Sequence, residues 1–180
     1  MNIQSYLKGF SAYLKLERSL SENSINAYLS DVSKLFEYLQ LVKQDATLQN
    51  ISLKELRDFI IWLNELGAQA STQARVISGI KSFFIYLMEE ELIKNDPSAL
   101  LETPKISRKL PDTLSIHEID QLIAAIDASK PEGMRNKAII EVLYSCGLRV
   151  SELTELKISN IFEETEFIKV VGKGNKERIV

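Results

Sequence analysis

Cysteine and histidine are almost absent from this 180-residue sequence, which contains one of each, Cys146 and His117. A single cysteine cannot form an internal disulfide, and together with one histidine it cannot supply the four ligands of a usual zinc site. Proline and glycine are also scarce, with 4 and 7 residues, so collagen-like repeats and low-complexity tracts are excluded. The rest of the composition, 45% hydrophobic and 26% charged, is typical of a globular protein.

Long hydrophobic runs are missing as well. The longest comprise only a handful of residues, such as Ile60 to Leu63, and are too short to cross a bilayer. The first residues, Met1 to Ser5, contain neither a basic segment nor a long apolar stretch, so no secretory signal is visible. We therefore expect a cytoplasmic protein with no membrane partner.

The sequence also lacks an excess of positive charge. It has 22 Lys and Arg against 25 Asp and Glu, a net charge of −3, and the balance is similar in residues 1–105 (11 basic, 13 acidic) and 106–180 (11 basic, 12 acidic). Because neutralising phosphates normally requires a surplus of Lys and Arg, charge alone argues against a nucleic-acid partner. Only the last dozen residues differ, with four basic side chains and one acidic one.

The first 105 residues predict four amphipathic helices. Apolar side chains recur there at three- or four-residue spacing, which places them on one face of a helix. The stretches with this pattern are 3–14, 25–39, 53–63 and 76–88. Ser52 and Glu55 form a capping box at the start of the third helix, Gly67 ends it, and the fourth begins near Ser71. Four such helices can bury a shared core.

Residues 102–114 break this periodicity with two prolines and three basic residues, and we place a linker at 106–114. A capping box of Ser115 and Glu118 then opens a new helix. Two more helices are predicted at 135–145 and 150–156.

The end of the chain changes to a β pattern. Residues 166–171 and 176–180 predict two strands joined by a turn at 172–175. The expected fold class is therefore mainly α: a four-to-five-helix domain at 1–105, then an α+β region at 115–180 that ends in a β-hairpin. Because the chain stops inside the second strand, which leaves an exposed edge, we expect the natural protein to continue.

Two motifs carry a resemblance to a known family: Cys146-Gly-Leu-Arg-Val-Ser-Glu-Leu153 and Gly172-Lys-Gly-Asn-Lys-Glu-Arg178. With them the sequence closely resembles the tyrosine recombinases, specifically the Xer-type site-specific recombinases and the phage-type integrases. Residues 28–39, 95–98 and 109–111 also look like this family, so the resemblance covers essentially the whole chain in order. It implies a core-binding (SAM-like) domain followed by the first part of a catalytic domain.

The family cuts and rejoins DNA strands through a covalent 3′-phosphotyrosine intermediate, with neither a metal nor a nucleotide cofactor, as a tetramer on double-stranded DNA. The resemblance implies that Arg149 is its first catalytic arginine and Lys173 its hairpin lysine. A guanidinium can hold two phosphate oxygens, and an ammonium can protonate the departing 5′ oxygen. Glu152, three residues after Arg149, would support the site by orienting that arginine.

Other catalytic residues of the family are missing from these 180 residues. They are the His-x-x-Arg pair, a second His or Trp, and the nucleophilic tyrosine. The only histidine, His117, lies in a capping box far upstream, and none of the six tyrosines occupies the nucleophile position. We therefore expect this chain to bind DNA weakly at best and to cut nothing.

The family also implies that the polar faces of the second and fourth helices cover one face of the duplex. The candidate DNA-binding residues are Ser24, Asn26, Tyr28, Lys34, Ser71, Thr72, Gln73, Arg75, Ser78 and Lys81, with Lys176 and Arg178 of the hairpin. Related proteins often have two arginines after the tyrosine that matches Tyr28, where this chain has Leu29 and Ser30, so weaker contacts are expected.

Simpler interpretations stay open. Arg149 can be an ordinary arginine at a helix end, Lys173 a solvated turn residue, and Glu152 one member of a helix ion pair. A phosphate-binding P-loop is excluded because its spacing is absent, and Cys146 lacks the histidine that a catalytic thiol needs. For the whole chain, the alternatives are a non-catalytic DNA-binding module and a helical protein-interaction domain.

Overall fold

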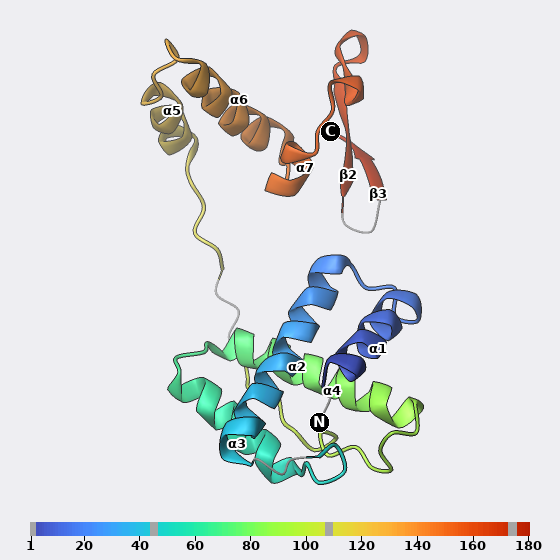
Figure 1. Cartoon of the computed structure of the whole chain (residues 1–180). Coiled ribbons are helices and arrows are strands. Elements are labelled where there is room, and N and C mark those ends of the chain that lie inside the picture. The colour runs from blue at the N-terminus through green and yellow to red at the C-terminus, as the bar shows by residue number, and fades with distance from the viewer. Residues whose placement is uncertain (1–2, 44–46, 107–109, 173–175) are drawn as a thin grey trace. The chain divides into compact units, whose positions relative to one another are not determined.

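A computed structural model of the chain describes residues 3–43, 47–106, 110–172 and 176–180. They belong to two compact units, Met1–Arg108 and Lys109–Val180 (Figure 1). Within the described ranges, no helix is long and apolar enough to cross a membrane.

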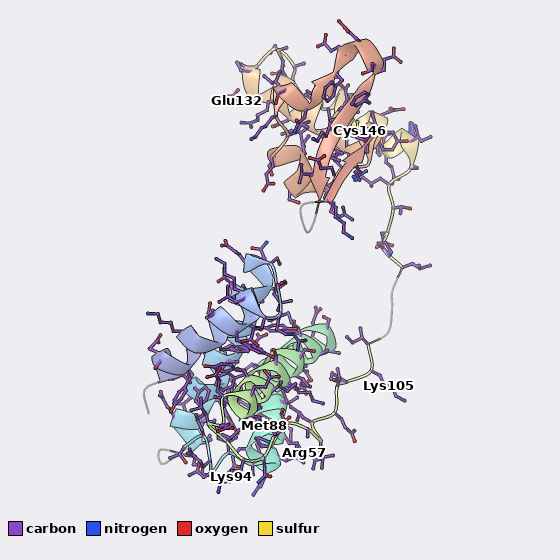
Figure 2. All side chains as sticks on the ribbon, turned by 90° about the vertical axis from the view of Figure 1, so that its right-hand side faces the viewer. Arg57, Met88, Lys94, Lys105, Glu132 and Cys146 are labelled. Atoms are coloured by element: carbon purple, nitrogen blue, oxygen red, sulfur yellow. The ribbon has the colours of Figure 1, made fainter. Side chains whose placement is uncertain are left out.

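The described residues of the first unit form four helices. They are α1 (Ile3–Leu16), α2 (Glu22–Val42), α3 (Leu53–Glu65) and α4 (Ala70–Glu89). Helix α2 crosses α4 and also contacts α1 and α3 (Figure 1). Their apolar faces meet in one core, where side chains fill the space between the helices (Figure 2). The largest fully buried side chains include Phe10, Leu14, Val32, Leu35, Leu39, Leu56, Phe59, Ile77, Ile80, Phe83, Phe84 and Leu87.

Aromatic rings dominate the centre of this core. The ring of Phe83 meets those of Phe10 and Phe36 edge to face, at centroid distances of 5.2 and 5.8 Å. At the α2–α3 contact, the ring of Trp62 lies 5.2 Å from that of Tyr38 and 6.0 Å from that of Phe59. Such pairs contribute about 0.5–1.5 kcal/mol each beyond the burial of apolar area. The four-helix core predicted from the periodicity is thus confirmed.

The start of α3 confirms the predicted capping box. The Ser52 N–H donates to Glu55 Oε2 at 3.0 Å, and the Lys54 N–H donates to Ser52 Oγ at 3.2 Å. Lys43, at the end of α2, donates to Glu55 Oε1 at 2.9 Å. The hydrogen bonds from the Ser52 hydroxyl and from Lys43 lower the pKa of Glu55 to about 2. One carboxylate therefore both caps α3 and joins it to α2.

In the second unit, the described residues form three α-helices and a small sheet. The elements are α5 (Ile116–Ala124), α6 (Pro131–Cys146), α7 (Val150–Thr154), β1 (Ile161–Phe162), β2 (Phe167–Gly172) and β3 (Lys176–Ile179). The strands are antiparallel in the order β1-β2-β3, with Val170 opposite Arg178 and Gly172 opposite Lys176. The mainly helical fold class that ends in a hairpin is confirmed.

Several details of this unit differ from the sequence prediction, among them the end of α7 at Thr154 instead of 156. Helix α6 starts at Pro131 rather than at 135, because proline is well suited to the first position of a helix. Strand β1 was not predicted, since its two residues are too few to show a period.

The predicted capping box at the start of α5 is present. The Ser115 N–H donates to Glu118 Oε2 at 2.8 Å, and the Ser115 hydroxyl accepts from the Glu118 N–H.

The second unit buries far less apolar surface than the first. Its buried hydrophobic residues in the described ranges are Ile119, Leu148 and Val170. Large apolar side chains of α6 and the start of α7 stay exposed, including Met134 at 64% and Val150 at 67%. Because so few apolar side chains are buried in it, we expect this unit to be less stable than the first.

Candidate active site and nucleic-acid interface

The loop between α6 and α7 presents Arg149. Helix α6 ends at Cys146, and Gly147 takes the left-handed conformation (φ 57°, ψ 38°) that a side chain would strain. Leu148 is buried and fixes the loop to the unit, whereas the Arg149 side chain is 70% exposed. The loop therefore directs one arginine into solvent from a firmly packed position.

Glu152 holds this arginine. Its carboxylate, 2% exposed, accepts from the Arg149 backbone N–H at 2.8 Å and from Arg149 Nη1 at 2.8 Å. Arg178 Nη2, from β3, donates to the same carboxylate at 2.9 Å. The backbone N–H of Arg149, the side chain of Arg178 and then that of Arg149 lower the pKa of Glu152 to about 2. Glu152 is therefore ionised at neutral pH, bound between two arginines.

Only one nitrogen of the Arg149 guanidinium is used by this ion pair. Among the described residues, none accepts a hydrogen bond from its Nε or Nη2. A guanidinium with a free edge can bind two oxygens of a phosphate side by side. The arrangement thus suits an anion that approaches from solvent while Glu152 fixes the arginine from behind.

The hairpin residues lie in different surroundings. Lys176 is exposed and makes no ion pair within the described ranges. Arg178 is turned toward α7, where it donates to Glu152 and, at 3.3 Å, to the carbonyl of Gly147. Lys173 lies outside the described residues.

In the first unit, Arg75 on α4 forms an ion pair with Asp31 on α2. Asp31 is completely buried, and burial raises the pKa of its carboxyl although Arg75 opposes this effect. Its Oδ1 has no hydrogen-bond partner in the described part of the chain. Arg75 uses Nη1 for Asp31 and for the carbonyl of Ala27, and its side chain is 42% exposed. Asp31 is a residue that the sequence prediction missed, because no local pattern links positions 44 residues apart.

The other candidates on α2 and α4 divide by burial. Those exposed are Asn26, Lys34, Ser71 and Ser78, and those half-buried are Ser24, Tyr28, Thr72 and Lys81. Gln73 is buried, and its amide donates to Asn64 Oδ1 at 3.0 Å and to the Ala68 carbonyl at 2.8 Å. That side chain joins α4 to the turn before it.

Metal ligands do not gather in this structure. Within the described ranges, no three His, Cys, Asp or Glu side chains lie together in a way that could hold a metal ion. His117 is exposed in the first turn of α5, and its Nε2 is 3.0 Å from the Gln121 amide nitrogen. Cys146 is half-buried at the end of α6 (Figure 2).

Comparison with known protein families identifies the family of this chain. The model of the phage integrase N-terminal SAM-like domain matches residues 7–91, and that of the phage integrase family matches residues 112–180. The chain belongs to the phage integrase family of tyrosine recombinases. The resemblance found in the sequence motifs is thereby confirmed.

One curated relative of this integrase-family chain is the tyrosine recombinase XerD of Oceanobacillus iheyensis. It is 40% identical over 174 residues, which cover 97% of this chain and 58% of the relative. The chain spans about three fifths of the length of the curated relatives it matches.

Solved structures of integrases and Xer recombinases have the same fold. A lambda integrase dimer bound to a COC′ core site has a TM-score of 0.78 at 21% identity, over 100% of this chain and 62% of the integrase. The XerH recombinase bound to palindromic difH has a TM-score of 0.70 at 25% identity, over 91% of this chain and 49% of XerH.

Proposed function

We propose that this chain supplies the DNA-binding unit and part of the active site of a site-specific recombinase, which cuts and rejoins DNA through a 3′-phosphotyrosine intermediate. The observation that carries the proposal is the exposed Arg149, whose free guanidinium edge is held in place by buried Glu152. In phosphoryl transfer, fixed cations stabilise the charge that develops on the phosphate oxygens. We propose Lys173 as the general acid, from its match to the family's hairpin lysine.

In this proposal residues 1–105 form the core-binding domain, 106–114 a linker and 115–180 the first part of the catalytic domain. The polar faces of α2 and α4 would lie on the duplex with Asn26, Lys34, Ser71 and Arg75 as its main contacts, all exposed. Gln73 would shape this surface from within. The partners would be double-stranded DNA and three further recombinase protomers, in the cytoplasm.

The 180 residues contain no His-x-x-Arg sequence, because His117 is followed by Glu118, Ile119 and Asp120. We therefore propose that this chain binds DNA without cutting it, and that cleavage requires a polypeptide that also carries the family's remaining catalytic residues. This is the same observation that favours the second candidate function, a DNA-binding module that occupies sites without catalysis.

Binding is tested with the 180-residue chain and a fluorescent DNA duplex, by anisotropy at several salt concentrations. Each neutralised phosphate contributes about −0.9 to the slope of log affinity against log salt, so one phosphate for each of the basic candidates Lys34, Arg75, Lys81 and Lys176 predicts a slope of about −3.6. A protein-interaction domain would show no affinity for the duplex at any salt concentration.

Cleavage is tested in a chimera that joins residues 1–180 to the segment of the Oceanobacillus iheyensis relative that carries the family's His-x-x-Arg pair and nucleophilic tyrosine. A nicked duplex with the relative's own site traps the covalent adduct. Arg149→Ala and Lys173→Ala should abolish the adduct and keep most of the DNA binding, while Arg57→Ala, at an exposed position of α3, should change neither. Adduct formation at the parent rate in the Arg149 or the Lys173 variant would contradict the assignment.

A further inference from the structure

Arg178 makes the contacts of a structural brace. From β3, its Nη2 reaches Glu152 Oε2 at 2.9 Å and the carbonyl of Gly147 at 3.3 Å. These partners precede it by 26 and 31 residues and lie on the two sides of Arg149. A single side chain therefore joins the hairpin to the loop and helix that carry the exposed arginine.

The alternation of the strand explains why Arg178 points there. It lies opposite Val170 of β2, which is 1% exposed, so both side chains stand on the face of the hairpin that packs inward. Glu177 stands on the other face, where it pairs with Lys169 at 2.7 Å. Among its described residues the hairpin thus has one ion pair on each face, and the inner one involves Glu152.

Strand β2 touches the same carboxylate through Gly172. A Cβ atom placed at Gly172 would lie 3.1 Å from Glu152 Oε1 and 3.9 Å from Arg149 Nη1. The backbone of β2 therefore comes closer to Glu152 than a residue with a side chain could without displacing the carboxylate. Both strands of the hairpin meet at Glu152, one by close backbone approach and the other by a charged hydrogen bond.

We propose that Arg178 is a positioning residue of the candidate active site. It holds Glu152, and through Glu152 the guanidinium of Arg149, in a fixed place relative to the β2–β3 hairpin. This role takes the place of the DNA contact that the sequence predicted for Arg178, and its value to the reaction rests on the function proposed above. The contact itself can be tested without DNA.

The test compares Arg178→Gln with wild type in the full 180-residue chain by NMR of labelled glutamate carboxyls. In wild type the pKa of Glu152 is about 2. An opposite charge in contact lowers a carboxyl pKa by about 1–3, so the glutamine variant should raise the Glu152 pKa by about 1 or more. The backbone amide of Arg149, which donates to the same carboxylate, should exchange with solvent several-fold faster.

Two matched variants serve as controls. Lys176→Gln removes a charge from the same face of β3, and Lys169→Gln removes the ion pair on the outer face. Neither should change the pKa of Glu152 or the exchange of the Arg149 amide. If the glutamine variant of Arg178 loses its fold, Arg178→Lys is measured instead, because lysine keeps the charge but carries it at the end of a flexible stem instead of on a rigid planar guanidinium. Its Arg149 amide should still exchange faster than in wild type.

A wild-type Glu152 pKa and wild-type exchange of the Arg149 amide in the Arg178 variant would overturn the proposal, as would equal changes in the Lys169 control.

DNA binding separates this proposal from the proposed function. Arg178→Gln should leave the salt slope unchanged, whereas Lys176→Gln should reduce its magnitude by about 0.9 if that lysine contacts a phosphate. If the wild-type chain shows no affinity for a duplex, the proposed function fails, and the pKa and exchange results still decide the role of Arg178. A loss of slope in the Arg178 variant with an unchanged Glu152 pKa would make it a DNA contact.

Discussion

Removal of Arg75 should destabilise the first unit through a carboxylate 44 residues away. Asp31 is completely buried, Arg75 is its ion-pair partner, and its Oδ1 has no partner in the described ranges. In the variant Arg75→Ala the carboxylate would stay buried without a compensating charge. Because burial already raises the pKa of Asp31 while Arg75 holds it down, that pKa should rise further in the variant.

The expected cost can be bounded from both sides. Breaking a buried ion pair typically costs about 3–5 kcal/mol, and the 42% exposure of Arg75 argues for the lower end. Protonation sets a ceiling, since each pKa unit corresponds to about 1.4 kcal/mol and pH 7 lies about 3 units above the ordinary aspartate pKa of 3.8. That ceiling is about 4 kcal/mol, so we expect a loss of about 3 kcal/mol at pH 7.

The sign of the pH dependence follows from the raised pKa. A group whose folded pKa lies above its unfolded value favours the folded state at low pH and loses that contribution as the pH rises through the folded pKa. The cost of Arg75→Ala should therefore shrink to about 1 kcal/mol or less near pH 4, where Asp31 is protonated in the folded variant and close to half protonated in the unfolded chain, at the ordinary pKa of 3.8. Asp31→Asn in the same variant should recover most of the loss at pH 7.

Urea unfolding of the full chain, followed by tryptophan fluorescence, measures this. Trp62 is the only tryptophan and packs against Tyr38 and Phe59, so the signal reports on the first unit alone. With a urea dependence of about 1.5 kcal/mol per molar, the midpoint should fall by about 2 M. Arg57→Ala should change stability by less than about 0.5 kcal/mol. A cost below about 1 kcal/mol at pH 7, or an equal cost at pH 4, would refute the reasoning.

Three further predictions concern the second unit. The pKa of Glu152 is about 2 in the folded chain, against an ordinary value of 4.5. Its contribution to the stability of the unit is therefore complete above pH 4.5 and is lost as the pH falls toward 2. The NMR signals of β2 and β3 should broaden over that range. In Glu152→Gln the same signals should already be broad at pH 7. Gly172→Ala places a Cβ 3.1 Å from Glu152 Oε1 and should cost about 1–2 kcal/mol, measured by amide exchange in β2 and β3. Finally, the fragment 109–180 alone should bind the dye ANS strongly and unfold without a sharp transition, because it buries few apolar side chains. The fragment 1–108 should bind the dye weakly and unfold cooperatively. Similar behaviour of the two fragments would contradict the inferred difference between their cores.

The parts of the fold that sequence could predict are those with local causes. Helical periodicity and capping boxes act within four residues, so the four helices of the first unit and the caps at Ser52 and Ser115 were accessible. Arg149 and Glu152 are three residues apart at the start of one helix, so their ion pair could also be predicted from local spacing. The pairs Arg75–Asp31 and Arg178–Glu152 join positions 44 and 26 residues apart, where only the packing of separate elements decides which charges meet.

Those distant pairs also bear on the charge balance that argued against a nucleic-acid partner. Asp31 and Glu152 are buried, and each pairs with one nitrogen of an arginine whose side chain is exposed, 42% for Arg75 and 70% for Arg149. At long range, an arginine and its carboxylate partner together count as zero charge. A phosphate in contact with the free edge of the guanidinium, however, lies closer to the cation than to the carboxylate. Under the proposed function, a net charge of −3 lowers long-range attraction to DNA while it leaves two arginines oriented for contact. The expected result is a DNA-binding surface that associates slowly and depends on shape and geometry more than on total charge.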